Sequence, residues 1–216
     1  MKKLYFCLVC TIFLTSLVQG QYYRQDRGVL LGVNAGYLYP TGDMGKLLKN
    51  GIGGNISVKY LINRVIGIGF ESGYYGFKSK ITKEQHDTKQ SYKAHLIPAL
   101  LEATFYIPTW NRTTLPYWGI SFGGYMTQIK VSQTEPAYSS QPSLSKKLFL
   151  FSPGIGIHGG VLFQLASDHW WMDLKIKADY VPEIKDDYEF DEYTQGNIGF
   201  NKMLNLGANI GILYQF

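Results

Sequence analysis

The stretch MLNLGANIGILYQF, residues 203–216, ends the chain and decides how the rest of the sequence is interpreted. From Leu204 to Phe216 every second residue is apolar, and the residues between them are mostly glycine, asparagine or glutamine. Alternation with a period of two is typical of a β-strand that has one apolar face. The stretch therefore predicts a strand at the very end of the chain.

The same alternation recurs in seven earlier segments: residues 29–39, 54–62, 65–77, 92–107, 117–129, 149–165 and 170–181. The connections between them alternate in length, long at 40–53, 78–91, 130–147 and 182–201 and short at 63–64, 108–115 and 166–169. Strands of about 10 to 15 residues exceed the soluble norm and are long enough to cross a bilayer. The pattern predicts an all-β fold, an eight-stranded antiparallel up-and-down transmembrane β-barrel over residues 29–216.

Composition indicates which face of the barrel points outward. The chain has 24 Gly and 17 Tyr, and the polar face of the predicted strands carries glycine, asparagine, serine and a few charges. Small residues suit a narrow eight-stranded lumen. The apolar face carries aromatic residues near the strand ends, as in the interfacial girdles of membrane barrels: Tyr37, Tyr39, Tyr60, Tyr74, Phe105, Trp118, Trp170, Tyr180, Tyr214 and Phe216. A soluble lipocalin-like carrier, with its apolar face inside, is the alternative.

The N-terminus has the pattern of a secretory signal peptide. Lys2 and Lys3 precede an apolar run at 4–17 and the sequence Val18-Gln19-Gly20, which predicts a cleaved signal peptide at 1–20 followed by a periplasmic segment at 21–28. Both cysteines lie in the removed part, so we expect no disulfide and no thiolate metal site. Without the two lysines the formal charge falls from +5 to +3, too mild a charge to indicate nucleic-acid binding.

Several motifs resemble a known family. LGVNAGYLYPTGDMG (31–45), GIGGNISVKYLINRVIGIGFESGYYGFKS (51–79) and HLIPALLEATFYI (95–107) are similar to segments of the small OmpA/OmpW-like outer-membrane β-barrel proteins, in their Bacteroidota form. The ending GANIGILYQF (207–216) resembles their closing strand. The resemblance implies a multi-pass protein of the outer membrane with both termini in the periplasm. It also implies that Tyr214 and Phe216 form the signal that the outer-membrane insertion machinery recognises.

Seven charged residues share the inward face of the predicted strands: Lys59, Glu71, Glu102, Asp173, Lys175, Lys177 and Asp179. Unpaired buried charge is costly, so we expect these side chains to form a salt-bridged network that closes the lumen. The alternative is an OmpW-like narrow channel for small or hydrophobic solutes.

Catalysis has little support in the sequence. The four histidines are His86, His95, His158 and His169. His86 stands next to Asp87 but has no serine partner in motif spacing. We expect His95 at the rim facing outward and His158 in the lumen. No cofactor and no metal cluster is expected. An envelope acyltransferase, deacylase or protease is the alternative.

The long connections are the better candidates for a partner surface. The second carries Lys78, Lys80, Lys83, Lys89 and Lys93, and the fourth carries the acidic–aromatic segment Asp186, Asp187, Tyr188, Glu189, Phe190 and Asp191. One interpretation is solvated loops that contact outer-membrane lipid, lipopolysaccharide and divalent ions. The sharper hypothesis is that the acidic–aromatic segment docks another envelope protein or binds calcium, although its spacing fits no EF-hand. As a function we expect a non-enzymatic structural or accessory subunit of a larger envelope complex.

Overall fold

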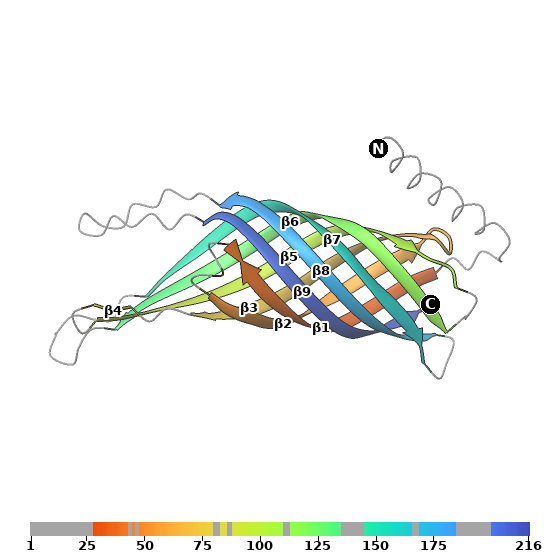
Figure 1. Ribbon diagram of the computed structural model, residues 1–216, viewed down its shortest axis with the longest axis horizontal. Helices are drawn as coiled ribbons and strands as arrows, with labels where there is room; N and C mark the ends of the chain where they lie inside the picture. Colours follow the sequence, from red (N-terminus) through yellow and green to blue (C-terminus); the bar gives the residue numbers. More distant parts are fainter. Residues whose placement is uncertain are drawn as a thin grey trace, which may run out of the picture.

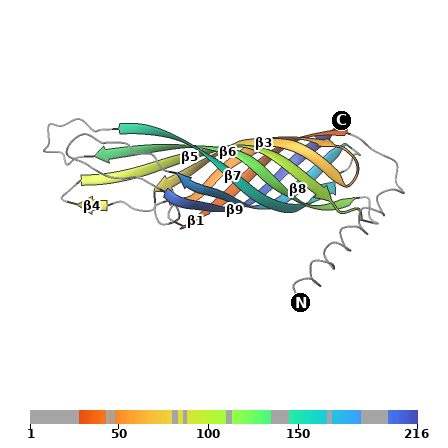
Figure 2. The same ribbon diagram turned by 90° about the horizontal axis from the view of Figure 1, so that it is seen from above.

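The structure is a closed antiparallel β-barrel (Figures 1 and 2). This computed structural model describes residues 28–42, 45, 48–79, 83–85, 88–109, 113–134, 145–165, 169–184 and 200–216. The strands are β1 (Gly28–Thr41), β2 (Leu48–Leu61), β3 (Ile66–Ser79), β4 (Lys83–Gln85), β5 (Thr88–Tyr106), β6 (Thr114–Thr134), β7 (Ser145–Gln164), β8 (Trp170–Ile184) and β9 (Phe200–Gln215).

Eight of these strands form the ring, and all of their pairings are antiparallel. Each strand pairs with its neighbour in sequence, β1 pairs with β9, and β3 pairs with β5 to close the ring. The three-residue strand β4 only extends the β5 edge. The eight-stranded antiparallel barrel predicted from the sequence is therefore confirmed. Its closing strand is β9, as the alternation in residues 203–216 indicates.

The two rims of the barrel differ. At one rim, which we name the turn end, β1 begins and β9 finishes, and the backbone N–H of Phe216 donates to the carbonyl of Val29 at 2.9 Å. The β2–β3 turn also lies there, where the side-chain oxygen of Asn63 accepts hydrogen bonds from the backbone N–H groups of Val65 and Ile66. At the other rim, the loop end, β5, β6 and β7 project past the remaining strands (Figures 1 and 2).

Several strands are longer than the sequence pattern predicted. β2 begins at Leu48 rather than at 54, β5 begins at Thr88 rather than at 92, and β7 begins at Ser145 rather than at 149. The reason is pairing: residues 48–53 lack clear alternation, yet Gly51, Ile52 and Gly53 pair with both β1 and β3. A ladder between two neighbours holds a segment extended even where its own residues give a weak strand signal.

The apolar face of the sheet points outward. Val33, Ile176 and Phe151 are 68%, 69% and 72% exposed, and exposed apolar residues of this kind recur on all eight ring strands. A surface so extensively apolar is not compatible with water and fits the hydrocarbon region of a membrane. The soluble carrier with an apolar interior is therefore wrong. No helix within the described residues is long and apolar enough to cross a membrane.

The interior has three layers, two of which are apolar, whereas the sequence pattern predicted a polar lumen with small residues and paired charges. An apolar layer near the loop end consists of Leu38, Leu48, Tyr75, Phe77, Ala94, Leu96, Leu100, Tyr125, Leu150, Val181 and Met203. A second near the turn end consists of Leu30, Leu61, Tyr106, Tyr117, Leu162 and Leu213. Between them lie the buried charges. Short-period alternation identifies which residues face inward, but it does not show that large inward residues gather at two heights.

Candidate functional site

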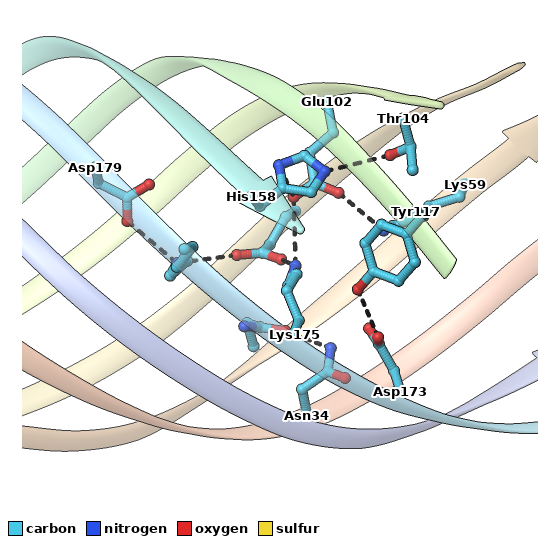
Figure 3. A network of polar contacts seen from close by, with 12 residues as sticks. Asn34, Lys59, Glu102, Thr104, Tyr117, His158, Asp173, Lys175 and Asp179 are labelled. Carbon is cyan, nitrogen blue, oxygen red and sulfur yellow. Dashed lines mark hydrogen bonds and ion pairs between the residues drawn. The ribbon is translucent and has the colours of Figure 1, made fainter. Parts of the chain in front are cut away.

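The middle layer of the lumen holds all seven inward charges predicted from the sequence, and each is buried. Figure 3 shows their contacts. The ammonium of Lys59 lies 3.2 Å from Glu102, and that of Lys177 lies 3.2 Å from Glu71 and 3.4 Å from Asp179. Lys175 forms ion pairs with both Glu71 and Glu102, the second at 3.4 Å. We refer to this set, with Asp173, as the central charge network.

The network links strands that are not neighbours. Lys175 and Lys177 are on β8, whereas Glu71 is on β3, four positions away around the ring in either direction. Their ion pairs therefore cross the full width of the lumen. A central ion pair of this kind connects opposite walls and excludes solvent between them, because the lumen of an eight-stranded barrel is only wide enough for side chains.

Glycines on neighbouring strands make room for these long side chains. Glycine stands directly opposite six of the seven charges, in the pairs Lys59–Gly69, Glu102–Gly69, Lys175–Gly160, Lys177–Gly207, Asp179–Gly156 and Asp173–Gly211. Gly69 lies between Lys59 and Glu102, and a Cβ there would lie 2.8 Å from Cγ of Lys59. The high glycine content of the polar face thus has a steric cause: each of these glycines leaves space for the charged side chain on the neighbouring strand.

Asp173 has a different type of partner from the other acids. The hydroxyl of Tyr117 on β6 donates a hydrogen bond to its carboxylate at 2.5 Å. The ammonium of Lys59 lies 5.2 Å from the centre of the Tyr117 ring, a cation–π distance. Sequence reasoning missed Tyr117, although its position in the alternation of β6 is that of the buried Ser121.

His158 lies in the lumen, as predicted from the sequence. Its Nε2 is 3.4 Å from the Thr104 hydroxyl, and its Nδ1 is 3.9 Å from a carboxylate oxygen of Glu102. Both apolar layers separate this group from the rims. The three side chains thus belong to a buried polar cluster, in which Nδ1 of His158 has no hydrogen-bond partner within the described part of the chain.

A second polar chain joins β1, β2 and β3. The Asn34 side-chain amide donates to Asn55 at 2.6 Å, and the Asn55 amide donates to the hydroxyl of Tyr75 at 3.0 Å. Tyr75 also lies beneath the ammonium of Lys177, 5.4 Å from its ring centre. The asparagines of the polar face therefore connect the central charge network to the apolar layer at the loop end.

The remaining predicted site residues lie elsewhere. Tyr214 and Phe216 are at the turn end, with ring centres 4.7 Å apart, and Tyr214 also contacts Trp170 at 5.0 Å. His95 stacks on Tyr74, whose hydroxyl is 2.6 Å from its Nδ1. The acidic–aromatic segment Asp186, Asp187, Tyr188, Glu189, Phe190 and Asp191 lies outside the described residues, as do His86 and the predicted signal peptide. Within the part of the chain that is described, no three His, Cys, Asp or Glu side chains could hold a metal ion.

Comparison with known proteins finds similar structures but no similar sequences. No protein-family model matches the chain, and no curated protein sequence matches it. Its structure is similar to Neisserial surface protein A, with a TM-score of 0.57 and 16% identity over 87% of this chain and 97% of that one. OprG from Pseudomonas aeruginosa has a TM-score of 0.51 and 13% identity over 89% and 97%. A major outer membrane protein from Thermus thermophilus has a TM-score of 0.50 and 12% identity over 87% of this chain and 99% of that one.

Identities this low show the fold alone. The chain has the closed eight-stranded fold of the small outer-membrane β-barrel proteins, of the OmpA/OmpW-like type. OprG and the Thermus thermophilus protein are outer membrane proteins. The predicted origin of this chain in Bacteroidota is untested by these comparisons.

Proposed function

We propose that this protein is a non-enzymatic barrel of the outer membrane with a closed lumen, acting as a structural or accessory subunit of a larger envelope complex. The observation that carries the proposal is the layered interior, in which the ion-paired centre lies between two apolar layers. A water-filled pore needs a continuous polar path from rim to rim. A lumen filled in this way leaves the outer wall and the rims as the surfaces through which the protein acts.

The closed lumen can be tested by electrical recording. The purified barrel, inserted in a planar bilayer, is expected to give no conductance steps at any applied voltage, and a general porin inserted in the same membrane controls for sensitivity. Regular steps would favour the narrow OmpW-like channel instead. Uptake of a small apolar dye into vesicles, equal with and without the barrel, extends the test to hydrophobic solutes.

The proposal assigns no reaction to the lumen. His158, Thr104 and Glu102 are the residues there that most resemble catalytic groups, and an apolar layer separates them from either rim. Deletion of the gene is therefore expected to leave the acylation and phosphorylation of lipid A unchanged by mass spectrometry. A lost or added acyl chain in the deletion strain, restored by the wild-type gene, would identify an envelope enzyme.

Membership of a complex requires a partner surface, and we assign it to the loop end. The proposed orientation places both termini in the periplasm and the loop end outside the cell, with the acidic–aromatic segment 186–191 there. Carboxylates interleaved with aromatic rings suit a protein interface. The segment is also the place where a divalent ion such as calcium would be expected to bind.

Purification from native membranes in a mild detergent tests this assignment. Stoichiometric envelope proteins are expected to co-purify with the wild-type barrel. They are expected to be lost from the variant Asp186→Asn, Asp187→Asn, Glu189→Gln and Asp191→Asn, which keeps the size of each side chain. A control variant, Lys80→Gln with Lys83→Gln, changes loop charge without touching the acidic segment. Recovery of the wild-type barrel alone would contradict the accessory role.

A further inference from the structure

Four lysines lie side by side on four consecutive strands of the barrel. In the sheet register, Lys78 on β3 pairs with Lys93 on β5, Lys93 pairs with Lys130 on β6, and Lys130 pairs with Lys147 on β7. Residues paired directly across a sheet occupy the same face. The four positions, which we name the lysine row, therefore form one continuous line across three strand spacings, about 14 Å in all.

The row lies on the outward face at the upper limit of the apolar band. Lys78 and Lys93 are exposed. Two residues nearer the turn end, the next outward positions are His95 on β5 and Phe149 on β7, and Phe149 is 60% exposed. Two residues of strand span about 7 Å. On β7 the lysine row thus stands one step beyond an exposed apolar residue, whereas on β6 Gln128 lies between Lys130 and the exposed Met126.

The arrangement concentrates positive charge with no acid in the adjoining sequence. None of residues 76–79, 91–95, 128–132 or 145–149 is aspartate or glutamate. Like charges directly opposite each other on neighbouring strands repel and weaken a sheet. A line of repelling lysines on four strands favours an anion with several negative groups that contacts more than one of them at once.

We propose that the lysine row binds the phosphate groups of an anionic glycolipid in the outer leaflet of the membrane. The inference rests on the proposed outer-membrane location with the loop end outward. Lysine ammonium groups bind phosphate as point charges. A lipid source is favoured over a soluble one because the row lies on the outward face of the wall, on the same strands as the exposed apolar residues Tyr74, Met126 and Phe149. Acyl chains of such a lipid would lie against the exposed side chains below it.

Polar groups beside the row suit the sugar part of such a headgroup. His95 lies two residues below Lys93 and stacks on Tyr74 with ring centres 5.3 Å apart. The Tyr74 hydroxyl is 2.6 Å from Nδ1 of His95, so the pair holds one fixed orientation. Gln128 lies opposite His95 on β6. These groups can donate hydrogen bonds to sugar hydroxyls and accept hydrogen bonds from them. Purely apolar side chains at the same height could contact only the acyl chains.

Native mass spectrometry from a neutral detergent, with added bisphosphorylated lipid A, tests the proposal. The wild-type barrel is expected to retain bound lipid A. The variant Lys78→Gln with Lys93→Gln is expected to bind lipid A at least about tenfold more weakly, since each lysine near a charged lipid surface contributes severalfold to affinity. The matched control, Lys83→Gln with Lys89→Gln, makes the same charge change farther from the membrane and is expected to bind as the wild type does. Equal binding by all three proteins would overturn the proposal.

Three further measurements identify the chemical group that is bound and its source. Dephosphorylated lipid A is expected to bind the wild type weakly, and binding as tight as that of the phosphorylated form would overturn the role of phosphate. Inorganic pyrophosphate binding as tightly as lipid A would reassign the row to a soluble anion. Lys78→Arg with Lys93→Arg, which keeps the charge, is expected to retain lipid. Because these assays use the isolated barrel, their outcome is independent of whether envelope proteins co-purify with it.

Discussion

Lys175 on β8 forms an ion pair with Glu71 on β3, the strand diametrically opposite it in the ring. Neither residue is close to the other in sequence, since 104 positions separate them. Both are buried, and the same carboxylate also accepts a hydrogen bond from Lys177 at 3.2 Å. Opposite walls of the barrel are thus joined through the carboxylate of Glu71 and the ammonium groups of Lys175 and Lys177. Because this contact forms only once the ring has closed, it depends on the complete barrel.

Removal of one partner from this pair is expected to destabilise the barrel strongly. Lys175→Met leaves Glu71 and Glu102 with one fewer counter-charge in a buried layer, which is expected to lower the free energy of unfolding by about 3–5 kcal/mol. Urea unfolding from lipid vesicles, followed by tryptophan fluorescence, measures the change. Lys49→Met, at an exposed position on β2, is the control and is expected to change stability by less than about 0.5 kcal/mol.

The double variant Glu71→Gln with Lys175→Met separates pairing from packing. Removing both charges is expected to cost less than the sum of the two single changes, because no isolated buried charge is left between them. A double variant whose loss equals that sum would mean that the two side chains act independently.

Tyr117 is expected to stabilise the barrel through its hydroxyl. Tyr117→Phe removes the 2.5 Å hydrogen bond to Asp173 and leaves that buried carboxylate without its donor, at an expected cost of about 1–3 kcal/mol. Tyr106 is the matched control, because it packs against Tyr117 at 5.8 Å and its buried hydroxyl has no hydrogen-bond partner within the described part of the chain. Tyr106→Phe is expected to be neutral. Equal effects of the two changes would contradict the assigned role of the hydroxyl.

Gly69 is expected to be intolerant of a side chain. A Cβ there would lie 2.7 Å from the carbonyl of Val58 and 2.8 Å from Cγ of Lys59, so Gly69→Ala is expected to cost about 1–3 kcal/mol through overpacking and displacement of the Lys59–Glu102 pair. On the same strand, Gly76 has its nearest neighbours at 3.7 and 4.0 Å. Gly76→Ala is therefore expected to be tolerated. Thermal unfolding of both variants in one detergent compares them, and equal losses would argue against the steric account.

Much of the fold could be predicted because the same alternation of apolar and polar residues recurs in every ring strand. Residues 204–216 have an apolar residue at every second position, and the outward parity of Ile176 and Phe151 follows from the same rule. The ends of β2 and β5 could not be predicted, because pairing with neighbouring strands extends segments that have little alternation of their own. The lysine row was also hidden, since its members are separated by connections of differing length and only the register aligns them.

The lumen residues illustrate a second limit. Parity alone placed Lys59 and Glu102 on the inward face, but it carries no information about which charge meets which. That choice depends on the stagger between strands, which sets the height of each side chain in the closed ring. Tyr117 was missed for a related reason: a tyrosine suits the lipid interface as well as the interior, and its partner Asp173 lies 56 residues away.

Substitution of Phe216 is expected to affect assembly in cells without affecting the stability of the folded barrel. Phe216 is 67% exposed, whereas its backbone N–H donates a hydrogen bond to Val29 that does not depend on the side chain. Phe216→Ser is therefore expected to fold into lipid vesicles in vitro with little loss of stability. If the residue is the insertion signal that the family resemblance implies, the same variant accumulates unfolded in the periplasm of cells. Phe216→Tyr, which keeps a terminal aromatic ring, is expected to assemble normally. Heat-modifiable mobility on gels measures assembly in both settings, and equal assembly of the serine and wild-type proteins in cells would contradict the signal.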